Sequence, residues 1–185
     1  MIGPSPQLAY PCIFFNGAAA KYLGGAGFVL HLCDLHFLAF SLGCGSSTNT
    51  RVELLALWAL LAVSKIMGIP LHTIYGDSLV IINWANRISS LDSPNLSHWC
   101  KDIRSLIHLF SPLTLTHIYR EHNQQADYLS KKSLGLDPGI GFFSEFMNGM
   151  IMDHGNFRLF KVMCRDSVPF LFFGTSTIFS CLAGP

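Results

Sequence analysis

The sequence carries little charge. Only 12% of its 185 residues are Asp, Glu, Lys or Arg, against roughly 25% in an average soluble domain. The formal net charge is +1, which excludes a general basic field that would attract a polyanion from every side. A nucleic-acid partner would therefore have to be held by local groups of Lys and Arg.

Paired cysteines and long apolar runs are also missing. The six cysteines are irregularly spaced and form no C-x-x-C pair, which argues against zinc fingers and a disulfide framework. We expect reduced, mostly buried thiols in a cytoplasmic or nuclear protein. The chain has no clean apolar run of about 18 residues, so no membrane span is predicted. No Lys or Arg precedes the first apolar run, which is untypical of a signal peptide.

Half of the residues are apolar, enough for a sizeable core. The apolar spacing and turn signals predict nine elements in the order β-β-β-α-β-α-α-β-α. They are strands at 10–15, 28–33 and 36–42, a helix at 49–67, a strand at 71–75, helices at 79–86 and 96–110, a strand at 113–118 and a helix at 124–134. The glycines at 24–27 are expected to form a turn. Hairpin-linked strands followed by strands between helices imply an α/β fold with a mixed five-stranded sheet flanked by helices.

The chain is predicted to have three parts. Residues 1–9 form a lead, residues 10–134 form the α/β domain, and residues 135–185 form an apolar tail of uncertain order. The stretch 168–182 favours a strand or a buried segment over a membrane span, because Pro, Gly and hydroxyl residues interrupt it. An exposed cluster in the tail would indicate a protein-interaction surface. Its candidates are Phe170, Phe172 and Phe173.

Two acidic residues stand beside or within apolar elements. Glu53 lies in a helix that is otherwise apolar from 52 to 63, and a buried carboxylate needs a partner. It could fold back in a capping box with Thr50 or face a site. Asp77 follows the strand at 71–75, where α/β sheets tend to hold ligands. Considered alone, the position favours an N-cap role for Asp77 or Ser78.

Two further polar residues also allow more than one interpretation. Asp127 lies on the last helix, four residues before Lys131, and that spacing is typical of a solvated ion pair. Asn16 precedes Gly17, and Asn-Gly is a strong hairpin-turn signal. Each local interpretation competes with a functional one when the residues are considered singly.

Five stretches, taken together, carry a resemblance. They are FNGAA at 15–19, GGAGFV at 24–29, TNTRVELLAL at 48–57, IYGDSL at 74–79 and YREHNQQADYL at 119–129. They resemble the ribonuclease H family, and specifically the short ribonuclease H-like domains of plant retroelement origin. The resemblance extends over residues 10–134 and has the family's order. It implies an endonuclease that cuts the RNA strand of an RNA–DNA hybrid.

The resemblance also implies a metal site. In this family four carboxylates hold two divalent ions, Mg²⁺ or Mn²⁺, which activate a water and stabilise the leaving oxygen. Glu53, Asp77 and Asp127 match three of these positions. His122 matches a histidine that assists proton transfer or product release. The fourth position, normally an Asp, is Asn16 in this chain.

The replacement at Asn16 predicts weak or absent ribonuclease activity, because an amide offers one neutral oxygen and no negative charge. The protein would then be an impaired nuclease, a non-catalytic module for RNA–DNA hybrid or structured RNA, or a protein-interaction module. Contacts with nucleic acid are expected from Arg51, Arg120, Asn123 and Lys131.

Overall fold

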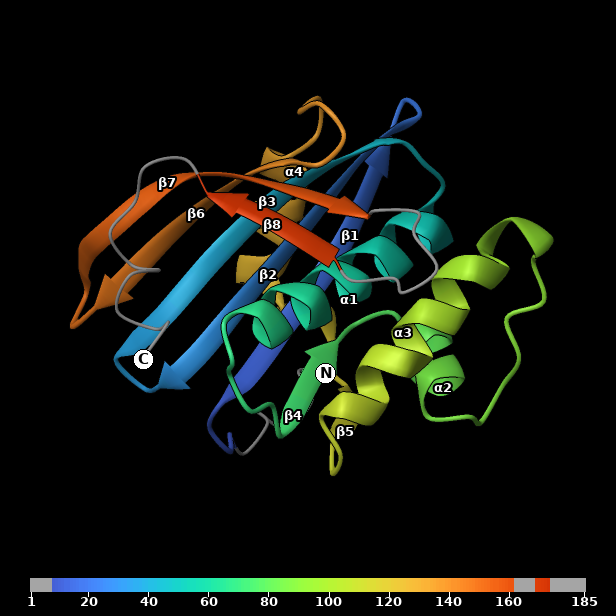
Figure 1. The fold of residues 1–185 in the computed structure, drawn as a ribbon, viewed down its shortest axis with the longest axis horizontal. Coiled ribbons are helices and arrows are strands. Elements are labelled where there is room, and N and C mark those ends of the chain that lie inside the picture. Colours follow the sequence, from blue (N-terminus) through green and yellow to red (C-terminus); the bar gives the residue numbers. More distant parts are fainter. Residues whose placement is uncertain (1–7, 162–168, 174–185) are drawn as a thin grey trace.

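The computed structural model describes residues 8–161 and 169–173, with side chains as far as Leu159 (Figure 1). The strands are β1 (Cys12–Ala20), β2 (Leu23–Cys33), β3 (His36–Ser46), β4 (Thr73–Gly76), β5 (Thr114–His117), β6 (Ile140–Met147), β7 (Met150–Lys161) and β8 (Pro169–Phe173). The α-helices are α1 (Asn49–Ile66), α2 (Leu79–Ala85), α3 (Ser97–Leu109) and α4 (Gln124–Lys132), with 3₁₀ turns η1 (Pro94–Leu96) and η2 (Arg120–His122).

All the strands join one mixed sheet in the order β5-β4-β1-β2-β3-β6-β7-β8. β4 pairs in parallel with both β1 and β5, and the other pairs are antiparallel. The α/β class and the mixed sheet are therefore confirmed. The predicted count of five strands is wrong, because the chain after residue 135 adds β6, β7 and β8 along the open edge of β3.

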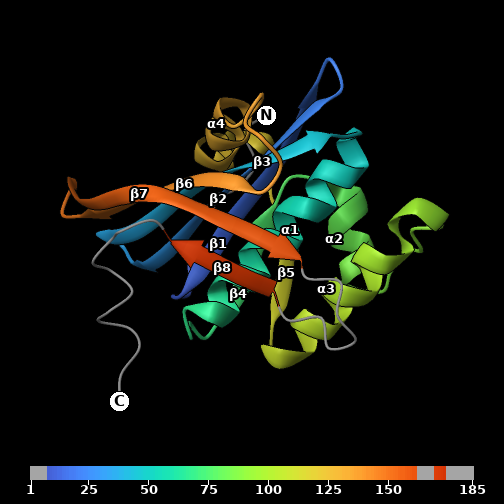
Figure 2. The same cartoon turned by 45° about the horizontal axis from the view of Figure 1, so that its top comes forward.

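The helices cover both faces of the sheet. Figures 1 and 2 show α1, α2 and α3 on one side of the sheet and α4 on the other. α1 is apolar on nearly all sides because it lies between the sheet and α3, where the rings of Trp58 and Trp99 meet edge to face with their centroids 5.2 Å apart. None of the helices in the described part of the chain combines the length and apolarity that a membrane span needs.

The glycine block does not form the turn predicted for it. The β1–β2 hairpin turns at Lys21 and Tyr22, which adopt φ values of 50° and 66°, and residues 24–27 lie inside β2. These glycines allow α4 to approach the sheet. A Cβ on Gly27 would lie 2.3 Å from the backbone nitrogen of Ser130 and 2.5 Å from the carbonyl oxygen of Ala126.

We expect Gly27→Ala to destabilise the fold by roughly 1–3 kcal/mol, because the added methyl group must push the α4 backbone away from β2. The free energy of unfolding in urea measures this loss. Because α4 carries Asp127, the same substitution should also disturb the site described below. An unchanged unfolding midpoint would contradict the close contact between β2 and α4.

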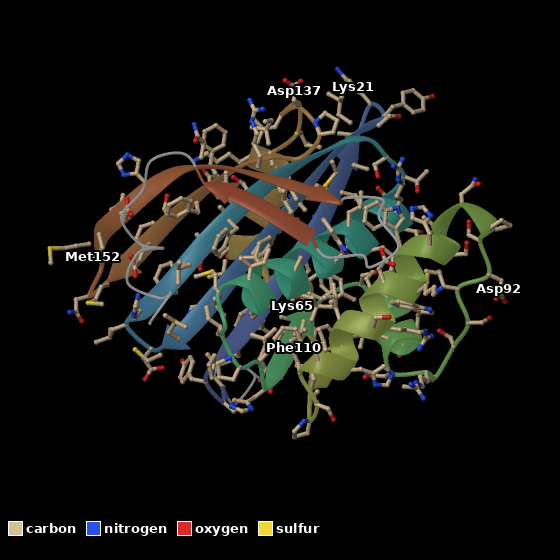
Figure 3. All side chains as sticks on the ribbon, viewed as in Figure 1. Lys21, Lys65, Asp92, Phe110, Asp137 and Met152 are labelled. Atoms are coloured by element: carbon tan, nitrogen blue, oxygen red, sulfur yellow. The ribbon has the colours of Figure 1, made fainter. Side chains whose placement is uncertain are left out.

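The added strands extend the hydrophobic core. Phe143 of β6 and Phe157 of β7 are buried and pack near Phe40 of β3, at ring-centroid distances of 6.3 and 5.9 Å. His36 Nε2 also lies 2.6 Å from an oxygen of Glu145, which links β3 to β6. At the far end, the β6–β7 hairpin exposes apolar residues, among them Met152 (Figure 3).

The predicted interaction cluster in the tail lies on β8, which pairs with β7. The side chains of Phe170, Phe172 and Phe173 lie outside the described residues.

Candidate functional site

A cavity of about 460 Å³ opens where β1, β4, α1 and α4 meet. The structure brings Asn16, Glu53, Asp77 and Asp127 into its wall, together with Arg120. Parallel pairing explains part of this convergence. Phe15 of β1 is in register with Gly76 of β4, so Asn16 and Asp77 follow neighbouring positions on adjacent strands. The remaining wall includes Gly17, Ala18, Ala19, Asn49, Thr50, Ser78, Val80 and Lys131.

Glu53 faces this cavity from the second turn of α1. The helix is capped by Thr48, whose side chain accepts a hydrogen bond from the backbone of Arg51, so the capping box with Thr50 is wrong. Glu53 Oε2 instead accepts a hydrogen bond of 3.0 Å from the backbone N–H of Gly17. A Cβ on Gly17 would lie 2.5 Å from the Glu53 nitrogen. Asn16-Gly17 is therefore a point of close strand–helix contact rather than a hairpin turn.

Burial, reinforced by the negative charge of Asp77, raises the pKa of Glu53 to about 8. The N–H of Gly17 and the charge of Arg120 oppose this rise in pKa but do not cancel it. Near neutral pH the carboxyl group of Glu53 is therefore largely protonated in the ion-free protein. Part of the pocket's expected negative charge is absent for this reason.

Asp77 is held in place by a buried amide. Of the two predicted N-cap candidates, Ser78 is the N-cap of α2, although its side chain makes no capping hydrogen bond. Asn123 Nδ2 donates to an oxygen of Asp77 at 3.2 Å and to the carbonyl oxygen of Phe15 at 2.8 Å. Asn123 is only 1% exposed. Its side chain thus ties α4 to the ends of β1 and β4, which is a positioning role, and its contact with nucleic acid stays a prediction.

Asp127 carries two ion pairs. Arg120 donates to its Oδ1 at 2.6 Å, and Lys131 donates to its Oδ2 at 2.5 Å. Partial burial pushes the pKa of Asp127 upward, but the hydrogen bonds from Lys131 and Arg120 outweigh it and hold the pKa below its ordinary value. The solvated i,i+4 pair with Lys131 is therefore present, and it coexists with the position of Asp127 in the pocket.

Asn16 points its amide nitrogen toward the same carboxylate and toward Ser130. Its Nδ2 donates to Ser130 Oγ at 2.9 Å and lies 3.5 Å from Asp127 Oδ1. Asn16 is 5% exposed. An Asp at this position could not donate either bond. Ser130, which the sequence patterns did not indicate, is thus the second partner that fixes the amide.

Residues 14–133 match the family model described as reverse transcriptase-like. The chain belongs to this family. Its fold is similar to that of RNase H1 from the archaeon Halobacterium salinarum, at 25% identity and a TM-score of 0.62, over 66% of this chain and 95% of that chain. It is also similar to LC11-RNase H1 in a crystal structure with an RNA/DNA hybrid, at 23% identity and a TM-score of 0.59, over 66% and 95%.

A further relative is the protein YpeP of Bacillus subtilis, which is 30% identical over 131 residues. The match covers 66% of this chain and 58% of YpeP, so the chain spans less than two thirds of that relative's length. Together these similarities assign the chain to the ribonuclease H-like superfamily.

The ribonuclease H-like superfamily implies a two-ion site, and the residues of this chain do not fit one. Among residues 8–159, no three acidic, histidine or cysteine side chains lie close enough to hold one ion together. Both oxygens of Asp127 are engaged by Arg120 and Lys131. Asn16, at the fourth ligand position, directs its amide nitrogen toward this carboxylate, where an ion would need oxygen ligands.

His122, predicted for the catalytic site, and Arg51, predicted to contact nucleic acid, line other cavities. His122 belongs to η2 and lines a separate cavity of about 90 Å³ with Phe14 and Val29. Arg51 lines another cavity of about 520 Å³ beside the start of α1, and its guanidinium donates to the carbonyl oxygen of Ser46 at 2.8 Å. That cavity combines a cation with hydroxyl and aromatic groups, and its wall includes Tyr22, Ser47, Thr48, His98 and Trp99.

Proposed function

We propose that this protein is a ribonuclease H-like nucleic-acid-binding domain for RNA–DNA hybrid or structured RNA, with RNA cleavage that is weak or absent. The observation that carries the proposal is the Asn16 amide, which donates toward Asp127 inside an otherwise assembled acidic pocket. The pocket brings together the residues that the resemblance implies, while Asn16 supplies less negative charge than the expected Asp would for collecting two dications.

Binding is supported by the distribution of polar groups. Arg120 and Lys131 line the acidic pocket, and Arg51 lines the neighbouring cavity on the other side of the α1 N-terminus. Two cavities of similar size beside one helix end suit a double-stranded ligand whose backbones are read by shape and charge. The similarity to a ribonuclease H1 solved with an RNA/DNA hybrid agrees with this ligand class.

Weak cleavage follows from the ligand set. A two-ion mechanism needs oxygen ligands that place the nucleophile in line, and a small misplacement can cost about 10²-fold in rate. The Mg²⁺ or Mn²⁺ expected from the resemblance stays a prediction, as does the plant retroelement origin. This chain's own residues would bind and orient the ligand through Arg120 and Lys131, and hold Asp77 through Asn123.

The test combines binding and cleavage on one substrate. Purified protein is incubated with a labelled RNA–DNA hybrid in Mg²⁺ or Mn²⁺, and both the bound fraction and the cut RNA are measured. We expect salt-sensitive binding with little cleavage, and no further loss of cleavage in Glu53→Gln. Rapid cleavage that disappears in Glu53→Gln would refute the loss of activity, and absence of binding would refute the proposal as a whole.

A further inference from the structure

The acidic pocket contains cations of its own. We infer that Arg120 and Lys131, both held by Asp127, bind a phosphodiester group of the nucleic acid directly, with no divalent ion between protein and phosphate. This inference rests on the proposed nucleic-acid binding and specifies the chemistry of the contact.

The first support is the arrangement of charge around Asp127. Its two oxygens face two different cations, at 2.6 Å to Arg120 and 2.5 Å to Lys131. Two positive charges against one negative charge leave these three side chains with a formal excess of one positive charge, and the charge of Asp77, which also acts on Arg120, lowers that excess over the whole cavity. The attraction for a phosphodiester therefore comes from the two cations themselves and not from a net positive pocket.

The second support is the accessibility of the cations. The side chain of Asp127 is 15% exposed, whereas those of Arg120 and Lys131 are 66% and 53% exposed. Arginine has five N–H donors and lysine has three. Arg120 and Lys131 each use one of these donors in a hydrogen bond to Asp127. The remaining donors are available to a ligand in the cavity that both residues line.

The third support is preorganisation. A shared, partly buried carboxylate fixes the two long side chains, so a ligand does not have to order them when it binds. Guanidinium and ammonium groups both form strong charge-assisted hydrogen bonds with phosphate. Asn49 and Thr50, at the positive end of the 18-residue helix α1, line the same cavity, and that helix end also favours a negative ligand.

The same contacts disfavour a dication beside Asp127. An ion ligated there would have to displace Arg120 and Lys131 or lie next to them, where its positive charge would be repelled by theirs. Asn16 adds no negative charge to offset this repulsion. A phosphate group gains attraction from the cations that would repel the ion.

The experiment measures the Kd of a labelled RNA–DNA hybrid by fluorescence anisotropy, in EDTA and in Mg²⁺ at matched ionic strength. We expect the two Kd values to agree within about twofold. Replacing both cations in Arg120→Gln, Lys131→Gln should weaken binding about tenfold or more and lower the slope of log Kd against log salt by about 2.

The matched control is Lys65→Gln, Arg158→Gln, which removes one exposed Lys and one exposed Arg outside the cavity. Lys65 is in the last turn of α1 (Figure 3), about 24 Å along the helix from Asn49. This control should leave the Kd and the salt slope nearly unchanged. Arg120→Lys, which keeps the charge, should retain most of the binding if the double variant proves unstable.

The outcomes separate the inference from the proposed function. Binding that appears in Mg²⁺ and vanishes in EDTA overturns the direct contact but leaves nucleic-acid binding intact. Equal loss in the double variant and in its control also overturns the inference. Failure to bind in both buffers overturns the proposed function itself.

Discussion

Asn16→Asp is expected to make the stability of the protein depend on divalent ions. In the native chain the amide nitrogen lies 2.9 Å from Ser130 Oγ and 3.5 Å from Asp127 Oδ1. A carboxylate at this position loses the donated hydrogen bonds and adds a second negative charge beside Asp127. Without an ion, we expect the melting temperature to fall by several degrees, because a loss of about 1–2 kcal/mol has that effect in a domain of this size.

Mg²⁺ should reverse this loss in Asn16→Asp. The added carboxylate gives the ion an oxygen ligand where the amide offered N–H groups, and an ion that binds only the folded state raises its stability. The wild-type protein should gain less from the same Mg²⁺ concentration. Thermal unfolding in EDTA and in Mg²⁺ measures the difference between the two proteins.

Cleavage should rise with the restored ligand. We expect Asn16→Asp to cut an RNA–DNA hybrid at least about 10²-fold faster than the wild type in Mg²⁺, because the added ligand corrects the placement of the reacting groups. Asn16→Ala is the control, since it loses the same hydrogen bonds without adding a charge. It should melt at a lower temperature than the wild type and gain no rescue from Mg²⁺. A Mg²⁺ response that is no larger in Asn16→Asp than in Asn16→Ala would contradict this account.

Local patterns predicted the elements on which the pocket is built. The helix expected at 49–67 is observed as Asn49–Ile66, and the strand expected at 71–75 is observed as Thr73–Gly76. In a helix the buried side chains recur every three or four residues, and in a strand every two. Both periods can be read from the spacing of apolar residues in the sequence. The ends of these two elements shift by no more than two residues, which is the usual uncertainty of a helix or strand boundary.

The prediction of a turn at 24–27 is wrong because the cause of these glycines is not local. Gly27 lies inside β2, where the backbone of α4 packs directly against it. Turn propensity describes what a glycine's own backbone allows, and it contains no information about a helix about 100 residues away. Spatial contact with α4 outweighs the local signal.

The added strands were missed for a similar reason. Between Glu145 and Phe146 the pairing of β6 with β7 shifts register, so the alternation that identifies a strand is interrupted. Partner choice along a sheet edge depends on which strand is open, and only the fold reveals that β3 has a free edge. The orientation of His122, which turns from the acidic pocket into another cavity, likewise depends on the phase of the η2 turn.

Glu53→Gln is expected to stabilise the ion-free protein as the pH rises. Burial and then the charge of Asp77 raise the pKa of Glu53 from 4.5 to about 8 in the folded protein. At pH values between 4.5 and 8, Glu53 keeps its proton in the folded state and has released it in the unfolded chain. The stability linked to Glu53 is therefore fully present below pH 4.5 and is lost as the pH rises toward 8, by at most about 1.4 kcal/mol per pH unit.

The size of this effect is limited by solvent in the pocket. Glu53 is partly exposed to solvent. We therefore expect its titration to change the free energy of unfolding by a total on the order of 2 kcal/mol, which is less than the full electrostatic limit. Glutamine keeps an oxygen that can accept the N–H of Gly17 but has no proton to release. At pH 8 in EDTA, Glu53→Gln should therefore be more stable than the wild type, and at pH 4.5 the two should be nearly equal.

Urea unfolding at several pH values between 4.5 and 8 measures this difference. The control is Asp137→Asn, which neutralises an exposed acid in the turn between α4 and β6 (Figure 3). Because Asp137 faces solvent, its variant should follow the wild-type pH dependence. If Glu53→Gln loses stability with pH as steeply as the wild type does, then Glu53 is not the group that couples folding to protons. If the stability of Glu53→Gln is independent of pH while that of the wild type and of Asp137→Asn is not, the coupling belongs to the carboxyl group of Glu53.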